Sequence, residues 1–197
     1  MRALLSWIDG HTNLMRVLFV FWAMFWTLNG ADKFFNGKSQ ANLKATKSVL
    51  VDNAGEQQYT LHNMEPMGFF GVTRDNKMKG YFARLNMPAS VATASLYFFA
   101  IFEVVIGVGF LLLVIWSLLP RGIRNNEEGL WGAFADRTVH RLCFKSGILV
   151  FLAFCTGDIL FGDRMELWEH GTFMLLTLVT YDLWFRTDQY VEATAGD

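Results

Sequence analysis

The feature that most constrains this fold is the division of its apolar residues into four long blocks. They cover about residues 12–31, 91–119, 142–161 and 167–185, and the stretches between them hold most of the charged residues. Crossing the hydrocarbon core of a bilayer takes roughly 20 residues of α-helix. A backbone inside lipid must also satisfy its own hydrogen bonds, which favours helices. The sequence therefore predicts an all-α protein, a four-helix transmembrane bundle that forms one integral membrane domain over residues 1–197.

The composition agrees with a membrane location. Apolar residues make up 53% of the chain and charged residues only 18%, whereas a soluble domain carries about 25% charged residues. The formal net charge of −1 leaves no basic face for nucleic acid. We therefore expect the lipid bilayer as a partner and exclude nucleic acid.

Two details of the apolar blocks bear on processing and redox chemistry. No small-residue cleavage site follows the first block, which favours a retained helix over a secretory signal. Cys143 and Cys155 lie in the third block, about 18 Å apart along a helix, too far for a disulfide. We interpret both cysteines as packing residues.

Two long segments are predicted to lie outside the membrane. Residues 34–90 form a long loop, in which Tyr59–Leu61 and Phe69–Val72 can make short strands or turns. Residues 121–141 form a second loop, in which Glu127–Val139 can make a short interfacial helix. Only Gly162–Glu166 join the third and fourth blocks, which predicts an antiparallel helical hairpin.

The distribution of basic residues predicts the orientation. The 121–141 loop holds four arginines, and Arg2, Arg16, Lys145 and Arg186 lie near the same face. Short loops rich in Lys and Arg remain in the cytoplasm. We therefore expect both termini and this loop in the cytoplasm, the 34–90 loop outside, and a bacterial inner membrane as the location.

Glu103 is a carboxylic acid about twelve residues into the second block, close to the expected bilayer midplane. An ionisable group at this depth is costly and must face other helices. One interpretation is a proton-handling or ligand-binding carboxyl group. The alternative is a structural hydrogen bond to a neighbouring helix.

A second group of polar residues is predicted at the outer end of the bundle. It comes from three helices and consists of Asp32, Lys33, Asp158, Glu166, Glu169 and His170. Glu166 and His170 are spaced i, i+4 and therefore share a helical face. Carboxylates with an imidazole can bind a metal, hold a quinone headgroup or transfer protons. The alternative is a capping and salt-bridge cluster, in which Lys33 neutralises Asp158 or Glu169.

The 34–90 loop contains a weak metal-binding pattern. His62, Met64 and Met67 combine an imidazole with thioethers, a ligand set that suits copper. Nothing in the sequence resembles a nucleotide-binding loop or a haem attachment motif, and His11, His62, His140 and His170 are too scattered to predict a haem held by paired histidines.

The first two blocks carry short motifs at equivalent places. In the first block Arg16 precedes the apolar run Val17–Leu28, and Asn29–Phe34 follows it with Gly30, Lys33 and Phe34. In the second block Phe102–Phe110 places two glycines after Glu103. In these features the chain resembles the DoxX-like family of small four-helix membrane proteins. The resemblance implies a link to membrane oxidoreductase systems, including thiosulfate oxidation coupled to quinone reduction. The long segments 34–90 and 121–141 depart from the compact family pattern.

These observations lead to one functional prediction and two alternatives. We expect an accessory or quinone-interacting subunit of a respiratory-type membrane oxidoreductase complex, with other membrane subunits as partners. Glu103, Lys33, Asp158, Glu169 and His170 would line its interior polar site. The first alternative is a non-catalytic subunit that assembles or stabilises a larger complex. The second is a small transporter.

Overall fold

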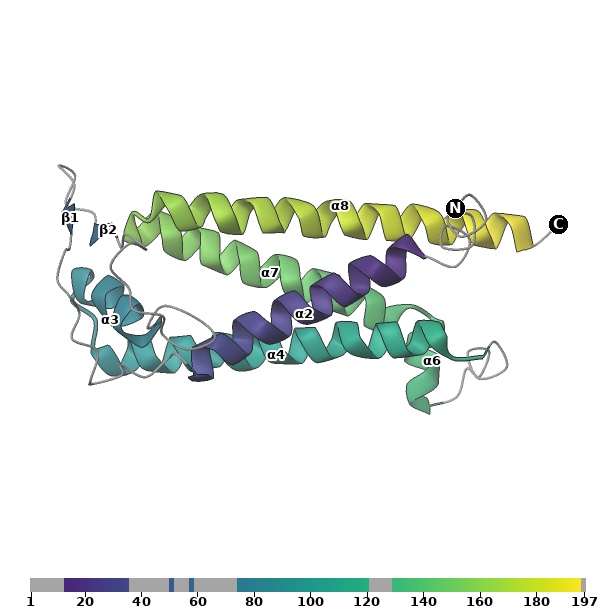
Figure 1. Ribbon diagram of the computed structural model, residues 1–197, viewed down its shortest axis with the longest axis horizontal. Helices are drawn as coiled ribbons and strands as arrows, with labels where there is room; N and C mark the ends of the chain where they lie inside the picture. Colours follow the sequence, from purple (N-terminus) through teal and green to yellow (C-terminus); the bar gives the residue numbers. More distant parts are fainter. Residues whose placement is uncertain (1–12, 36–49, 52–56, 59–73, 121–128, 196–197) are drawn as a thin grey trace, which may run out of the picture. The chain divides into compact units, whose positions relative to one another are not determined.

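The computed structural model describes residues 13–35, 50–51, 57–58, 74–120 and 129–195. This part of the chain is almost entirely helical (Figure 1). The helices are α2 (Leu14–Phe35), α3 (Arg74–Arg84), α4 (Ala89–Leu118), α6 (Gly129–Ala135), α7 (Thr138–Phe161) and α8 (Arg164–Ala195). Two short strands, β1 (Leu50–Val51) and β2 (Gln57–Gln58), pair antiparallel.

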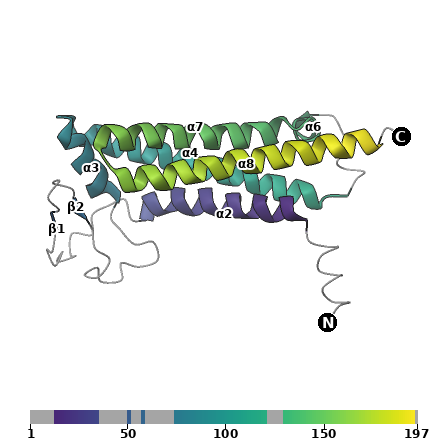
Figure 2. The same ribbon diagram turned by 90° about the horizontal axis from the view of Figure 1, so that it is seen from above.

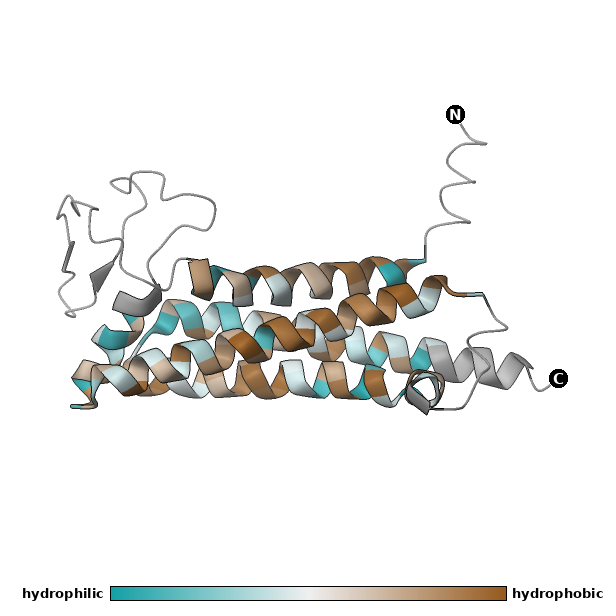
Figure 3. Cartoon of the chain, turned by 90° about the horizontal axis from the view of Figure 1, so that it is seen from below, coloured by the Kyte–Doolittle hydropathy of each residue, from teal (hydrophilic) through white to brown (hydrophobic). Residues whose placement is uncertain are grey.

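Among the described residues, three helices are long and apolar enough to cross a membrane. They are α2, α4 and α7, and α4 is the most apolar, with a mean hydropathy of 2.8. Hydrophobic residues dominate the middle of these helices (Figure 3). The fourth predicted block lies in α8, which is not one of the three. The long apolar helices indicate an integral membrane protein in contact with a lipid bilayer.

The helices extend beyond the apolar blocks that predict them. α2 continues to Phe35, α7 begins at Thr138 and α8 covers Arg164–Ala195. The predicted link Gly162–Glu166 is therefore reduced to Gly162 and Asp163. Hydropathy marks the part of a helix that suits lipid, whereas the helix itself continues wherever backbone hydrogen bonds and caps allow.

The predicted loops are also partly helical. α3 and the start of α4 fall within the predicted 34–90 loop. The interfacial helix predicted over Glu127–Val139 is observed as the shorter α6, which carries Trp131 and Phe134. The predicted strands or turns at Tyr59–Leu61 and Phe69–Val72 lie outside the described residues.

The chain divides into two compact units. The first, which we call the bundle unit, comprises Met1–Gly30 and Phe99–Asp197, and the second comprises Ala31–Phe98. The second unit holds the end of α2, β1, β2, α3 and the start of α4. Within it the rings of Phe34 and Tyr97 lie 5.6 Å apart, and Lys77 and Arg84 both lie over the ring of Tyr81.

The core of the bundle unit is built from aromatic side chains on α2. Trp22 and Trp26 are almost fully buried and stack on one another. Trp22 contacts Phe110 of α4, and Trp26 contacts Phe151 of α7 at a ring-centroid distance of 4.7 Å. The indole Nε1 of Trp22 donates a hydrogen bond to Thr180 of α8. α2 therefore contacts each of the three other long helices within this unit.

Glycines allow α2 and α4 to approach closely. A Cβ atom at Gly30 would lie 2.7 Å from the backbone oxygen of Ala100, and one at Gly107 would collide with Thr27. Small residues at such crossings let helix backbones pack tightly in membranes. The close contact with Thr27 explains why a glycine occupies position 107 in a stretch of α4 otherwise rich in large apolar residues.

α7 and α8 run side by side and antiparallel (Figures 1 and 2). Phe144 of α7 contacts Tyr181 and Trp184 of α8, and Phe151 stacks on Phe173. The hairpin predicted from the short link is confirmed. Cys143 and Cys155 are buried and free on α7, as expected of packing residues.

Candidate functional site

The turn between α7 and α8 sets the geometry of the candidate site. Gly162 ends α7 in the left-handed conformation at φ 77°, and its N–H group bonds to the carbonyl oxygen of Asp158. Glycine suits this position because a Cβ atom would be strained there. Asp163 follows, and its Oδ1 accepts a hydrogen bond from the N–H group of Glu166, which caps the start of α8. The short turn brings the end of α7 against the start of α8.

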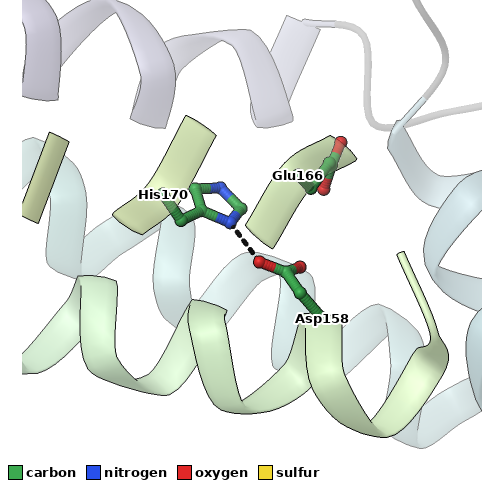
Figure 4. Close-up of side chains that lie close together, drawn as sticks. All are labelled: Asp158, Glu166 and His170. Carbon is green, nitrogen blue, oxygen red and sulfur yellow. Dashed lines mark hydrogen bonds and ion pairs between the residues drawn. The ribbon is translucent and has the colours of Figure 1, made fainter. Parts of the chain in front are cut away.

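Across this turn Asp158 of α7 and His170 of α8 form a hydrogen bond. Asp158 Oδ2 lies 2.7 Å from His170 Nδ1 (Figure 4). The Asp158 side chain is 7% exposed and the His170 side chain 23% exposed. Because an ionised carboxylate only accepts hydrogen bonds, Nδ1 donates and the second ring nitrogen, Nε2, remains for another partner.

Glu166 completes a set of three potential ligands. Its carboxylate, the Asp158 carboxylate and the His170 imidazole each offer one atom, and these atoms all lie within 4.8 Å of one another. Glu166 and His170 come from α8, and Asp158 faces them from α7 (Figure 4). Glu166 and His170 are partly buried, whereas Asp158 is buried. The set therefore combines one nitrogen and two oxygen donors from two helices.

The surroundings of His170 are aromatic. Its ring lies 4.9 Å from the ring of Phe154 and 6.5 Å from that of Phe151, both on α7. Phe151 also packs against Trp26 in the core of the bundle unit. Electrostatic interactions are stronger beside such apolar side chains than in water. The arrangement can hold a proton, a polar headgroup or a cation at the edge of an aromatic core.

The other predicted site residues are not members of this three-residue set. Glu103 is 1% exposed on α4 of the bundle unit. Asp32 is buried and Lys33 half-buried in the second unit. Glu169 is exposed and does not join the three-residue set, whose second carboxylate is Glu166. The copper candidates His62, Met64 and Met67 lie outside the described residues.

The structure also places a histidine that the sequence did not single out as a site residue. His140 is buried near the start of α7, and its ring stacks on Trp184 of α8 at 5.1 Å and 8°. Phe19 of α2 packs against the same ring. No local sequence signal distinguishes this histidine, because its partners come from other helices.

Comparison with known proteins adds no assignment. The chain matches no protein-family model, no curated protein and no solved structure. The resemblance of its first two spans to the DoxX-like family stays a prediction. A function for this chain is therefore inferred from the geometry of Asp158, Glu166 and His170.

Proposed function

We propose that this chain is a four-span integral membrane subunit of a quinone-linked oxidoreductase complex, with Asp158 and His170 contacting the quinone headgroup. The observation that carries the proposal is the 2.7 Å hydrogen bond between these side chains beside Phe154. The resemblance of the first two spans to the DoxX-like family supports the same function. The complex belongs to a bacterial inner membrane, and other membrane subunits are its partners.

In this proposal α8 is the fourth span. It runs antiparallel to α7 and packs against it from Asp158 and His170 to Phe144 and Trp184. A helix that accompanies a spanning helix over this length crosses the same lipid layer. Its charged residues flank an uncharged stretch, with Glu169 before it and Asp182 and Arg186 after it.

The hydroxyl groups of α8 reduce the cost of placing it in lipid. Thr172, Thr177 and Thr180 each donate a hydrogen bond to a backbone oxygen of the preceding turn. A hydroxyl group satisfied within its own helix does not need water. The low mean hydropathy of α8 therefore overestimates the free energy cost of placing this helix in lipid.

The arginines support a cytoplasmic location for the end of the bundle unit opposite the candidate site. Arg16 donates a hydrogen bond from Nη2 to the backbone oxygen of Ser117, so the start of α2 lies against the end of α4. Arg141 lies in the first turn of α7, and Arg186 lies in the later part of α8. In the proposed orientation both termini are therefore cytoplasmic, and the Asp158–His170 pair lies toward the outer surface.

The chemistry follows from the two ring nitrogens of His170. Reduction of a quinone takes up two electrons and two protons at its carbonyl oxygens. Nε2 can donate a hydrogen bond to one carbonyl oxygen, while Asp158 orients the ring and stabilises its protonated form. Phe154 offers a flat apolar surface for the quinone ring. Glu103 is another buried carboxyl group among the described residues of the bundle unit and a candidate proton carrier.

The test is purification of the native complex in mild detergent, followed by mass spectrometry and extraction of bound quinone. We expect haem or flavin subunits and quinone to co-purify. His170→Ala should abolish quinone binding while the complex still assembles, and Glu169→Gln, which changes an exposed neighbour, should retain both. Assembly that survives with activity unchanged in His170→Ala favours a stabilising subunit. A lone, cofactor-free chain that moves solute across liposomes favours a transporter and contradicts the proposal.

The span count has its own test. Four spans place both ends of the chain on one side of the membrane, whereas three spans place them on opposite sides. Single cysteines introduced at residues 5 and 192, in a chain with Cys143 and Cys155 replaced by alanine, can be labelled with an impermeant reagent. Labelling of both from the cytoplasmic side supports α8 as a span.

A further inference from the structure

We infer that Asp158, Glu166 and His170 form a binding site for one divalent transition-metal ion of the zinc, cobalt, iron or nickel type. The inference uses residues of the proposed quinone site but stands on the geometry of the three side chains. Only its regulatory consequence, given below, rests on the proposed function.

The distances suit a small ion after a modest movement. Zinc binds imidazole nitrogen and carboxylate oxygen at about 2.0–2.2 Å, so tetrahedral donors lie about 3.3 Å apart. The three donor atoms are within 4.8 Å of one another, and Asp158 Oδ2 and His170 Nδ1 are 2.7 Å apart. To bind the ion, Asp158 Oδ2 and His170 Nδ1 must move apart by less than about 1 Å. The Glu166 carboxylate must move closer to them by at most about 1.5 Å. Rotation of the partly buried Glu166 side chain provides this movement.

The donor types select the class of ion. An imidazole nitrogen favours zinc, iron, cobalt and nickel over magnesium and calcium, which prefer oxygen ligands in larger number. Because two of the three ligands are carboxylates, which are hard donors, the site should not prefer the soft copper(I) ion. Three protein ligands leave a fourth position for water or another ligand, as in open zinc sites.

The positions of the ligands are held by the hairpin. Asp158 is buried, and its backbone oxygen accepts the hydrogen bond from Gly162 that caps the end of α7. Asp163 accepts a hydrogen bond from the backbone N–H group of Glu166 and so holds it at the start of α8. Glu166 and His170 lie one turn apart on the same face of α8. The backbone positions of the three ligands are thus set before an ion arrives, and rotation of the Glu166 side chain supplies the remaining movement.

The ion would affect the proposed quinone chemistry. An ion bound by Asp158 and His170 would occupy the same side chains that contact the quinone headgroup in the proposed function. Zinc is therefore expected to inhibit quinone reduction reversibly, which would make the cluster a regulatory site.

The test uses the full chain in mild detergent, with its affinity tag removed and metals stripped by a chelator. Co²⁺ is added and its visible absorption followed, Zn²⁺ is used to displace it, and bound metal is counted by mass spectrometry after desalting. We expect one ion per chain. Removing a ligand should cost at least as much as the 10–100-fold typical of loss of an outer-shell contact, so Glu166→Gln should weaken binding by about tenfold or more.

Two control variants keep the inference falsifiable. Glu169→Gln changes an exposed carboxylate on the same helix, and His62→Asn removes the histidine of the copper candidate; both should bind Co²⁺ as the wild type does. Absence of bound metal, or loss of binding in either control but not in Glu166→Gln, overturns the metal site. Quinone binding is measured separately, by quenching of tryptophan fluorescence. Metal binding without quinone binding contradicts the proposed function alone, and the reverse result contradicts the metal site alone.

Discussion

Two histidines lie toward opposite ends of the contact between α7 and α8, and their rings differ in their hydrogen-bond partners. His140 stacks on Trp184, and its Nδ1 has no hydrogen-bond partner among the described residues. His170 bonds to Asp158 through Nδ1 and remains partly accessible. Both rings also touch phenylalanine, so aromatic contact does not distinguish them.

A carboxylate bonded to the imidazole, rather than the burial of the ring, therefore marks the histidine for which we propose a chemical role. His140 behaves as a flat, neutral packing residue that closes the space between α7, α8 and α2. His170 has a partner that fixes its ring and can stabilise a positive charge. Substitutions at five points test the contrast between the His140 and His170 ends of the bundle, from the largest expected effect to the smallest.

Activity should separate the two histidines most strongly. Loss of a positioned acid–base group lowers rates by about 10²–10⁴-fold, so His170→Ala should reduce quinone-dependent turnover by about 100-fold or more. His140→Phe should leave turnover within about twofold, because the ring is replaced by one of similar size. Turnover of the purified complex is the measurement. Equal losses in both variants would remove the contrast.

Truncation of His140 should destabilise the bundle. Removing a large buried ring leaves a cavity and costs about 3 kcal/mol, so His140→Ala should lower the free energy of unfolding by about that amount. His140→Phe should restore most of it, since the stack on Trp184 is kept. Unfolding of the detergent-solubilised chain by SDS measures both. A polar role for His140 would instead make the phenylalanine variant as unstable as the alanine variant.

Replacing His170 by phenylalanine should have a smaller cost in stability, of a different origin. The buried Asp158 carboxylate loses its hydrogen-bond partner, which costs about 1–3 kcal/mol. The double variant Asp158→Leu with His170→Phe should recover stability, because both polar groups are then gone. If the double variant is as unstable as the sum of the single changes, the pair is not coupled.

The hydrogen bond between Trp22 and Thr180 lies between the two histidine sites. Such bonds in membrane bundles contribute about 0.6 kcal/mol on average, so Thr180→Val should lower stability by that order. Thr172→Val is the matched control, because Thr172 is exposed and bonds only to its own helix among the contacts described. A loss several times larger than in the control would show that the middle of the bundle, rather than its ends, limits stability.

The smallest effect concerns Asp136, next to the His140 end and outside the membrane-spanning part of α7. Hydrogen bonds from the backbone N–H group and side chain of Thr138 hold the pKa of Asp136 below its usual value of 3.8. The ionised carboxylate therefore stabilises the fold above that usual value, and the contribution is lost as pH falls through the lowered pKa. Asp136→Asn should lower the melting temperature slightly at pH 7, and the difference from wild type should shrink as the pH falls below 3.8. A difference that does not change with pH would exclude this cause.

The sequence predicted the helical membrane architecture because hydropathy and segment length are local properties. The apolar blocks led to α2, α4 and α7, and the short link led to the α7–α8 hairpin. Helix ends could not be predicted as well, because Phe35 and Thr138 belong to helices that continue past the apolar residues. Whether α8 spans the membrane depends on hydroxyl groups satisfied by its own backbone, which a hydropathy average does not record.

The residues of the candidate site were also predicted only in part from the sequence. Asp158 and His170 were predicted from their depth in two adjacent helices, and the structure brings them together. Glu169 was predicted as a member of the interior set, but the rotation of α8 exposes it and turns Glu166 toward Asp158. Adjacent residues on a helix point about 100° apart, whereas residues four apart share a face. The sequence by itself determined where the long apolar helices form and that Asp158 and His170 lie at one depth. Only the tertiary structure decided which of them face one another, because helix rotation is set by packing against neighbouring helices.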